Sequence, residues 1–128
     1  MTEIPSQAYG EFSRRIDDQG HARHQVFKAQ IELTYSCNLS CVHCYTDCYN
    51  RPDLIREREL STAQITGILD QLHEQGILWV CLTGGEIFMR RDFLEIYAHA
   101  RRKGFLVTLF TNATLIGERI ADYLEAHP

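Results

Sequence analysis

The chain has 128 residues, 45% of them hydrophobic, which is enough for one compact domain and too few for two. Its formal net charge is −4, from 13 basic and 17 acidic residues scattered along the chain. Because no basic block is present, the composition does not indicate a nucleic-acid partner. The longest apolar run, residues 77–82, is far shorter than the roughly 20 residues of a membrane helix, so we expect no membrane segment.

The first 20 residues contain acidic side chains and no apolar core, unlike a secretory signal. Five cysteines without such a signal favour a reducing compartment over a disulfide framework. We therefore expect a cytoplasmic protein.

Residues 1–26 are polar and weakly patterned, and they predict a loose leader that is either poorly ordered or contains one short helix. From Phe27 to Thr34 apolar and polar residues alternate, which predicts a strand with two different faces. Residues 45–60 are polar, include Pro52 and a run of alternating charges, and predict a loop.

Two elements are predicted to follow this loop. Ser61 and Gln64 have the spacing of a capping box and begin a helix, and Gly76 occupies the position where a helix typically ends. Residues 77–82 are apolar without interruption, which is typical of a strand covered on both faces in a parallel sheet.

The same unit is predicted to recur. Asp92 and Glu95 are placed to cap a second helix that ends at Gly104, residues 105–110 predict a third strand, and residues 116–125 a third helix. Three strands alternating with three helices predict an α/β fold with a parallel sheet and right-handed crossovers.

Three cysteines lie close together after the first predicted strand. Cys37, Cys41 and Cys44 are spaced four and then three residues apart, and thiolates so close in sequence indicate a loop wrapped around iron–sulfur or zinc. Structural zinc sites take four protein ligands, commonly in pairs, whereas this run is asymmetric. A zinc site completed by Cys48 or His43 remains the alternative, and it would make the chain a structural interaction module.

Polar residues also follow the other two predicted strands. Gly84, Gly85 and Glu86 come after the second strand, and Thr111 and Asn112 come after the third. Because loops that leave parallel strands emerge at one edge, we expect these residues to lie beside the cysteines. Paired glycines let the backbone approach a ligand, and Glu86 is placed to hold an ammonium group, while Thr111 and Asn112 are suited to either a turn or a ligand contact.

The motif formed by Cys37, Cys41 and Cys44, C-x-x-x-C-x-x-C, resembles the cluster motif of the radical S-adenosylmethionine (radical SAM) enzymes. The resemblance implies a 4Fe–4S cluster with one open iron that chelates S-adenosylmethionine. It also implies one-electron cleavage of the cofactor to a 5′-deoxyadenosyl radical, which abstracts hydrogen from a substrate. A fragment that binds the cluster without turnover is a further alternative.

The resemblance also assigns roles to the other residues of the predicted edge. It implies that Gly84, Gly85 and Glu86 bind the amino group of the cofactor's methionine, and that Thr111 and Asn112 contact the cofactor. His43 fills a position that is usually aromatic and lies near the adenine. The sequence departs from the family at Ile87, where many members have proline, and at Ala113, where many have glycine.

As a fold, the resemblance implies that residues 27–128 form the first three units of a partial (β/α)6 TIM-like barrel, so the remainder of the barrel or a partner chain is expected. The loop at residues 45–50 is similar to that of members with a SPASM-type C-terminal domain, which often modify ribosomally made peptides. The resemblance therefore implies a peptide substrate and an electron donor such as a flavodoxin or ferredoxin.

Overall fold

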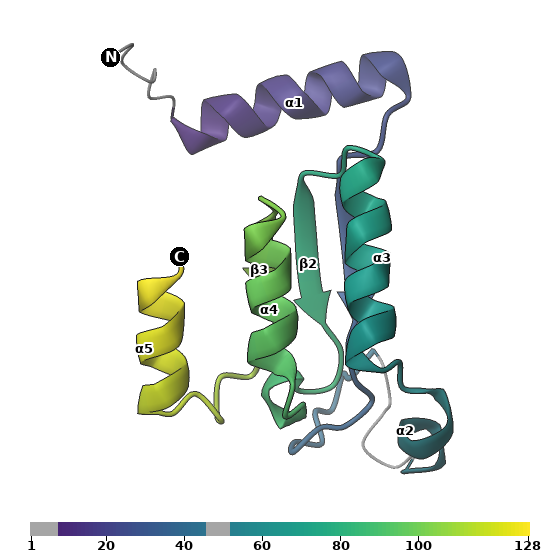
Figure 1. Cartoon of the computed structure of the whole chain (residues 1–128), viewed down its shortest axis with the longest axis vertical. Coiled ribbons are helices and arrows are strands. Elements are labelled where there is room, and N and C mark those ends of the chain that lie inside the picture. Colours follow the sequence, from purple (N-terminus) through teal and green to yellow (C-terminus); the bar gives the residue numbers. More distant parts are fainter. Residues whose placement is uncertain (1–7, 46–51) are drawn as a thin grey trace.

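The computed structural model describes residues 8–45 and 52–128 (Figure 1). In chain order its elements are α1 (Tyr9–Arg23), β1 (Lys28–Glu32), α2 (Pro52–Arg58), α3 (Thr62–Glu74), β2 (Trp79–Thr83), the 3-10 turn η1 (Ile87–Met89), α4 (Phe93–Arg102), β3 (Leu106–Leu109) and α5 (Glu118–Ala126). Within this described part, no helix is long and apolar enough to cross a membrane.

The three strands form one parallel sheet in the order β1-β2-β3. Val80 in the central strand lies opposite Ala29 of β1 and Val107 of β3. A helix lies between successive strands in the chain, α3 before β2 and α4 before β3. The predicted α/β fold of parallel βα units is thus confirmed.

Helices α3 and α4 cover one face of the sheet (Figure 1). Apolar side chains of these helices pack against every second residue of the strands, and burial of each large side chain contributes about 2 kcal/mol to stability. The buried cluster includes Leu33, Ile65, Leu69, Val80, Leu82, Ile87, Phe93, Ile96, Ala100 and Phe105. This core gives the loops at the end of the strands a rigid support.

The helices begin and end close to the predicted residues, apart from two differences. Ser61 and Gln64 form the expected capping box, and α3 ends before Gly76. Asp92 is the N-cap residue of α4, but its side chain makes no capping hydrogen bond, because it is engaged by a guanidinium group instead. The last helix begins at Glu118 rather than at residue 116, with Gly117 as its N-cap.

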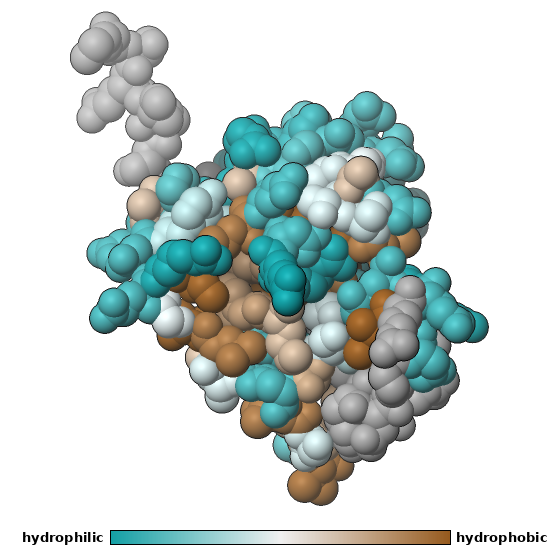
Figure 2. All heavy atoms as spheres, turned by 60° about the horizontal axis from the view of Figure 1, so that its bottom comes forward, coloured by the Kyte–Doolittle hydropathy of each residue, from teal (hydrophilic) through white to brown (hydrophobic). Residues whose placement is uncertain are grey.

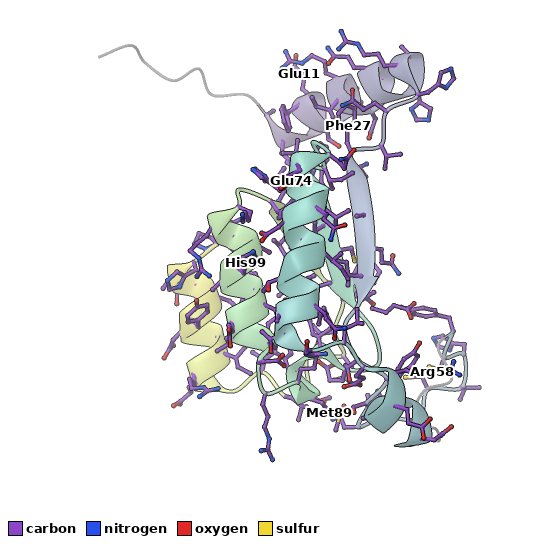
Figure 3. The ribbon with its side chains drawn as sticks, turned by 45° about the vertical axis from the view of Figure 1, so that its right-hand side comes forward. Glu11, Phe27, Arg58, Glu74, Met89 and His99 are labelled. Atoms are coloured by element: carbon purple, nitrogen blue, oxygen red, sulfur yellow. The ribbon has the colours of Figure 1, made fainter. Side chains whose placement is uncertain are left out.

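The leader contains a helix of 15 residues, α1, longer than the short helix expected. This helix lies across the amino ends of the strands (Figure 1). Its Tyr9 hydroxyl accepts a hydrogen bond from the Trp79 indole at 3.0 Å, and the Phe12 and Trp79 rings are 5.9 Å apart. Phe27 lies between α1 and the start of β1 (Figure 3), against Gly20, where a Cβ would come within 2.8 Å of the Phe27 ring. Contacts with β2, distant in sequence, thus stabilise the helix.

The predicted loop at residues 45–60 is wrong over α2, Pro52–Arg58. Proline fits the first turn of a helix because its missing N–H has no partner there, and Asp53 favours the same end through the helix dipole. Pro52 thus marks the start of a helix here, and the run of alternating charges at residues 56–59 covers its end.

The second face of the sheet is more open than predicted for β2. Trp79 and Thr83 are buried, whereas Cys81 between them is only half-buried, so the prediction of a strand covered on both faces is wrong at this residue. Cys81 and Thr108 line an open pocket, and burial raises the pKa of the Cys81 thiol.

Candidate functional site

The loops that leave the three strands meet at the carboxyl edge of the sheet, at the bottom of Figure 1. We call them the cysteine loop (residues 35–45), the glycine loop (residues 84–86) and the third loop (residues 110–117). Hydrogen bonds connect all three, so the structure brings together the residues that the sequence predicted to meet at this edge.

The glycine loop runs directly against the start of the cysteine loop. The Gly85 N–H donates to the carbonyl of Thr34 at 2.9 Å, and the Glu86 N–H donates to the carbonyl of Ser36 at 2.8 Å. Gly84 has φ 136°, and a Cβ at this position would lie 2.5 Å from the Thr34 carbonyl oxygen. Only glycine permits this approach of two backbones, which explains the residue in structural terms.

Glu86 points into the protein. Its side chain is fully buried, at 0% exposure, and both carboxylate oxygens accept hydrogen bonds. The donors are the Phe88 N–H at 3.1 Å, the Asn112 N–H at 2.8 Å and the Thr111 hydroxyl, which lies 2.8 and 2.9 Å from the two oxygens. A buried carboxylate needs such donors because desolvation of an unpaired charge is costly. This carboxylate therefore joins the glycine loop to the third loop.

The third loop is in turn joined to the cysteine loop. The Asn112 side-chain amide donates to Asn38 Oδ1 at 3.0 Å, and the Asn38 amide donates to the Thr114 hydroxyl at 2.8 Å. The turn between them is closed by the Ala113 N–H, which donates to the Thr111 hydroxyl at 2.9 Å. Ala113 has φ 62°, a left-handed conformation that explains why glycine suits this position.

The three predicted cluster ligands all lie in the cysteine loop. Cys37 and Cys44 are half-buried and Cys41 is exposed. The Leu39 N–H lies 3.5 Å from Cys37 Sγ, and the Cys44 N–H donates to the Cys41 carbonyl at 3.2 Å, which closes a turn.

Two further residues were predicted around these ligands. His43, the residue predicted near the adenine, is exposed on the same loop. Cys48 lies outside the described residues.

The cysteine thiols provide a donor set that suits an iron–sulfur cluster. Among residues 8–45 and 52–128, no three or more His, Cys, Asp or Glu side chains are gathered closely enough to hold one metal ion. Soft thiolate ligands in a short loop are also the donor set that iron–sulfur clusters require.

Two side chains that the sequence did not single out support the cysteine loop. Glu59 Oε1 accepts hydrogen bonds from the Thr34 hydroxyl at 2.5 Å and from the Tyr35 N–H at 2.9 Å. The Tyr45 hydroxyl lies 3.1 Å from the hydroxyl of Thr83, at the end of β2. These contacts hold both ends of the loop, and they join residues at least 24 positions apart, for which the sequence has no local signal.

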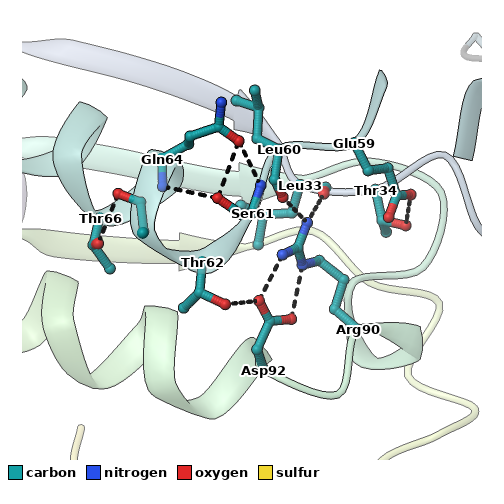
Figure 4. Close-up of polar contacts among 11 residues, drawn as sticks. Leu33, Thr34, Glu59, Leu60, Ser61, Thr62, Gln64, Thr66, Arg90 and Asp92 are labelled. Carbon is teal, nitrogen blue, oxygen red and sulfur yellow. Dashed lines mark hydrogen bonds and ion pairs between the residues drawn. The ribbon is translucent and has the colours of Figure 1, made fainter. Parts of the chain in front are cut away.

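Arg90 connects the same region to the helices (Figure 4). Its guanidinium donates to the carbonyls of Leu33 at 2.8 Å and Leu60 at 3.1 Å, and it makes two hydrogen bonds with Asp92. The Arg90 side chain is only 8% exposed. Its guanidinium holds the pKa of Asp92 below the ordinary value, and a hydrogen bond from Thr62 acts in the same direction. The end of β1 is thereby fixed to the first turns of α3 and α4.

The surface at this edge carries exposed apolar side chains. Figure 2 brings the carboxyl edge forward and shows hydrophobic residues between polar ones. Met89 lies at this end of the molecule, as Figure 3 shows. The exposed hydrophobic residues of the loops include Leu39, Val42, Tyr45, Met89, Phe110, Leu115 and Ile116.

Comparison with known proteins shows which family and which relatives the chain resembles. The family model described as "Radical SAM superfamily" matches residues 31–128. "Fe-coproporphyrin III synthase" of Methanosarcina barkeri is 40% identical over 93 residues, which is 73% of this chain and 23% of that protein. "Mycofactocin maturase MftC" of Mycobacterium ulcerans is 38% identical over 113 residues (88% and 30%), and "PqqA peptide cyclase" of Xanthomonas oryzae is 36% identical over 98 residues (75% and 25%). The chain thus spans about a quarter of the length of these relatives.

Solved structures with the same fold include SuiB of Streptococcus suis. SuiB bound to the precursor peptide SuiA superposes with a TM-score of 0.70 at 19% identity, over 100% of this chain and 29% of that one. SuiB bound to S-adenosylmethionine gives a TM-score of 0.64 at 19% identity, over 97% and 28%. At this identity the likeness shows the fold, and it agrees with the predicted first part of a partial barrel.

Proposed function

The chain belongs to the radical SAM superfamily, and from this premise we propose that it binds a 4Fe–4S cluster and S-adenosylmethionine at the carboxyl edge of the sheet, as part of an enzyme that modifies a peptide. The observation that carries the proposal is the contact between the glycine loop and the cysteine loop. Two backbone hydrogen bonds and the close approach at Gly84 fix the glycines beside the segment that leads to Cys37.

The residues divide into two roles. Cys37, Cys41 and Cys44 hold the cluster through their thiolates, which leaves one iron for the cofactor. The backbone of Gly84 and Gly85, close to the start of the cysteine loop, is positioned to bind the polar end of the cofactor's methionine.

When bound, the cluster and S-adenosylmethionine supply one-electron chemistry for hydrogen abstraction from the substrate. The described residues contribute orientation, because the loops that carry the ligands are fixed to a packed core. The exposed apolar side chains around the loops provide a surface on which the substrate or the rest of the barrel excludes water. We further propose a reducing, cytoplasmic location, because thiolate ligands need a reducing compartment. We also propose an electron donor such as a flavodoxin or ferredoxin, because the cluster has to be reduced.

A peptide substrate is supported by the names of the relatives. Two of the three kinds of relative are named a maturase and a peptide cyclase, and SuiB is bound to a precursor peptide. The relative named as a synthase of an iron porphyrin indicates the competing substrate class. The two substrate classes are separated by an assay for 5′-deoxyadenosine. The reduced and reconstituted protein is mixed either with peptides encoded beside the gene or with an iron porphyrin, and the release of 5′-deoxyadenosine is measured. Stimulation by peptide supports the proposal, and stimulation by the porphyrin alone overturns it.

Cluster binding is tested by anaerobic reconstitution with iron and sulfide. We expect about four irons per chain, and loss of the cluster in Cys37→Ala, Cys41→Ala and Cys44→Ala. Cys81→Ala is the matched control, because Cys81 lies on β2 and not in the cysteine loop. This variant is expected to retain the cluster. Tight zinc uptake without iron uptake would overturn the enzyme proposal and leave a structural module.

A further inference from the structure

The carboxylate of Glu86 is buried, and three donor groups of the protein already bond its two oxygens. Its two oxygens accept from the Phe88 N–H, the Asn112 N–H and the Thr111 hydroxyl, all supplied by the protein. The side chain is 0% exposed, so a ligand at the surface of the edge does not reach it without a rearrangement. An ammonium group would have to displace these donors in order to bind there.

The contacts continue from Glu86 to the loop that carries the cysteines. The Asn112 backbone N–H donates to the Glu86 carboxylate at 2.8 Å, and the Asn112 side-chain amide donates to Asn38 Oδ1 at 3.0 Å. Asn38 directly follows Cys37. One chain of hydrogen bonds therefore runs from the glycine loop, through the third loop, to the residue beside the first predicted cluster ligand.

We propose that Glu86 is a positioning residue, and that the chain of contacts Glu86–Asn112–Asn38 sets the cysteine loop relative to the glycine loop. The proposal rests on the proposed function for what the two loops bind. It differs from the role expected from the sequence, in which the Glu86 carboxylate holds the cofactor's ammonium group. In the arrangement proposed here, the backbone of the glycine loop faces the cofactor, and the Glu86 side chain does not.

Glutamine at position 86 breaks this chain for a specific reason. Every contact of the carboxylate is with a donor, and each oxygen faces one backbone N–H, that of Phe88 or that of Asn112. In Glu86→Gln the side-chain NH2 must therefore face an N–H donor in either orientation of the amide, although the shape of the side chain is kept. Asn38→Ala breaks the other end of the chain at an exposed residue, so this variant is expected to fold even if Glu86→Gln does not.

A double-mutant cycle on cofactor affinity tests the proposal. The dissociation constant of S-adenosylmethionine is measured on the cluster-loaded protein from the cofactor-induced change in its electron paramagnetic resonance spectrum. We expect Glu86→Gln to weaken binding about tenfold and Asn38→Ala about fivefold, with the double variant within about twofold of Glu86→Gln alone, because both act through one chain. Glu95→Gln, at an exposed position on α4, is the matched control and is expected to leave the affinity unchanged.

Independent effects that multiply to about fiftyfold in the double variant would overturn the proposal, since they indicate that Glu86 acts without Asn38. An unchanged affinity in Asn38→Ala would also overturn it.

A second measurement separates this proposal from the proposed function. In the iron-free protein, hydrogen exchange at the Phe88 and Asn112 amides is expected to be at least about tenfold faster in Glu86→Gln than in the natural chain, because both amides lose their acceptor. Unchanged exchange would overturn the positioning role. If the natural chain takes up no cluster, the proposed function fails, while this exchange experiment still decides whether Glu86 holds the loops.

Discussion

Substitution of Gly84 by alanine tests the contact on which the site depends. An ideal Cβ at this position would lie 2.5 Å from the carbonyl oxygen of Thr34 and 3.0 Å from its nitrogen. Both atoms belong to the backbone, so no side-chain rotation relieves the overlap. The φ of 136° adds strain of its own, because side chains other than hydrogen rarely adopt it.

The expected loss in the free energy of unfolding follows from these two effects. A strained backbone conformation costs about 1–3 kcal/mol. Relief of the overlap moves the glycine loop away from the cysteine loop and weakens the hydrogen bonds from Gly85 and Glu86, at about 1 kcal/mol each. We therefore expect Gly84→Ala to destabilise the chain by about 3 kcal/mol or more.

The assay is urea unfolding of the iron-free, reduced chain, followed by circular dichroism. Gly67→Ala is the matched control, because a Cβ at this position in α3 meets nothing within 4 Å. Alanine there is expected to stabilise the helix by up to about 1 kcal/mol. If Gly84→Ala were within about 0.5 kcal/mol of the natural chain while the control behaved as expected, the described approach of the two loops would be wrong.

Two further predictions concern stability. Ala113→Gly is expected to raise the free energy of unfolding by about 1 kcal/mol, because the left-handed φ of 62° is unfavourable for alanine, and a destabilised variant in the same urea assay would contradict this. Asp92→Asn is expected to lose about 2 kcal/mol at pH 7, because it weakens charge-assisted hydrogen bonds with Arg90. Since the folded-state pKa of Asp92 is lowered, its contribution is present above the unfolded value of about 3.9 and is lost as the pH falls through the folded value. The difference in the free energy of unfolding between the natural chain and Asp92→Asn should therefore shrink below about pH 4. A difference that stays constant with pH would refute this prediction.

The parallel sheet was predictable because its signals are local. The capping box at Ser61, the stop at Gly76 and the apolar run at residues 77–82 each specify an element within a few residues. The repeat of strand and helix then fixes the edge at which the loops emerge. The positions of the cysteine loop and the glycine loop follow from this topology.

The contacts that hold the loops in place were not predictable, because they join residues far apart in the chain. The Glu59 carboxylate stands in a run of alternating charges that indicates only a solvated segment, yet it accepts from Thr34 across 25 positions. Glu86 beside two glycines predicted a ligand contact, and that contact stays a prediction. The hydrogen bonds between its buried carboxylate and the third loop had no local signal, because their donors lie at least 25 positions away along the chain.

Local capping rules also failed where a stronger partner was near. Asp92 has the residue type and position of an N-cap, but the buried guanidinium of Arg90 takes its carboxylate. A charge-assisted bond is roughly twice as strong as a neutral one, which explains the outcome. The spacing to Arg90 is visible in the sequence, but its burial is not.

The measurement that tests the central claim most directly is electron paramagnetic resonance of the reconstituted, reduced chain, recorded with and without S-adenosylmethionine. The account predicts the signal of a reduced 4Fe–4S cubane that changes when the cofactor is added, because the proposed cluster would leave one iron for the cofactor and the glycine loop lies against the cysteine loop. A cubane signal that the cofactor leaves unchanged, or no cubane signal at all, would contradict it.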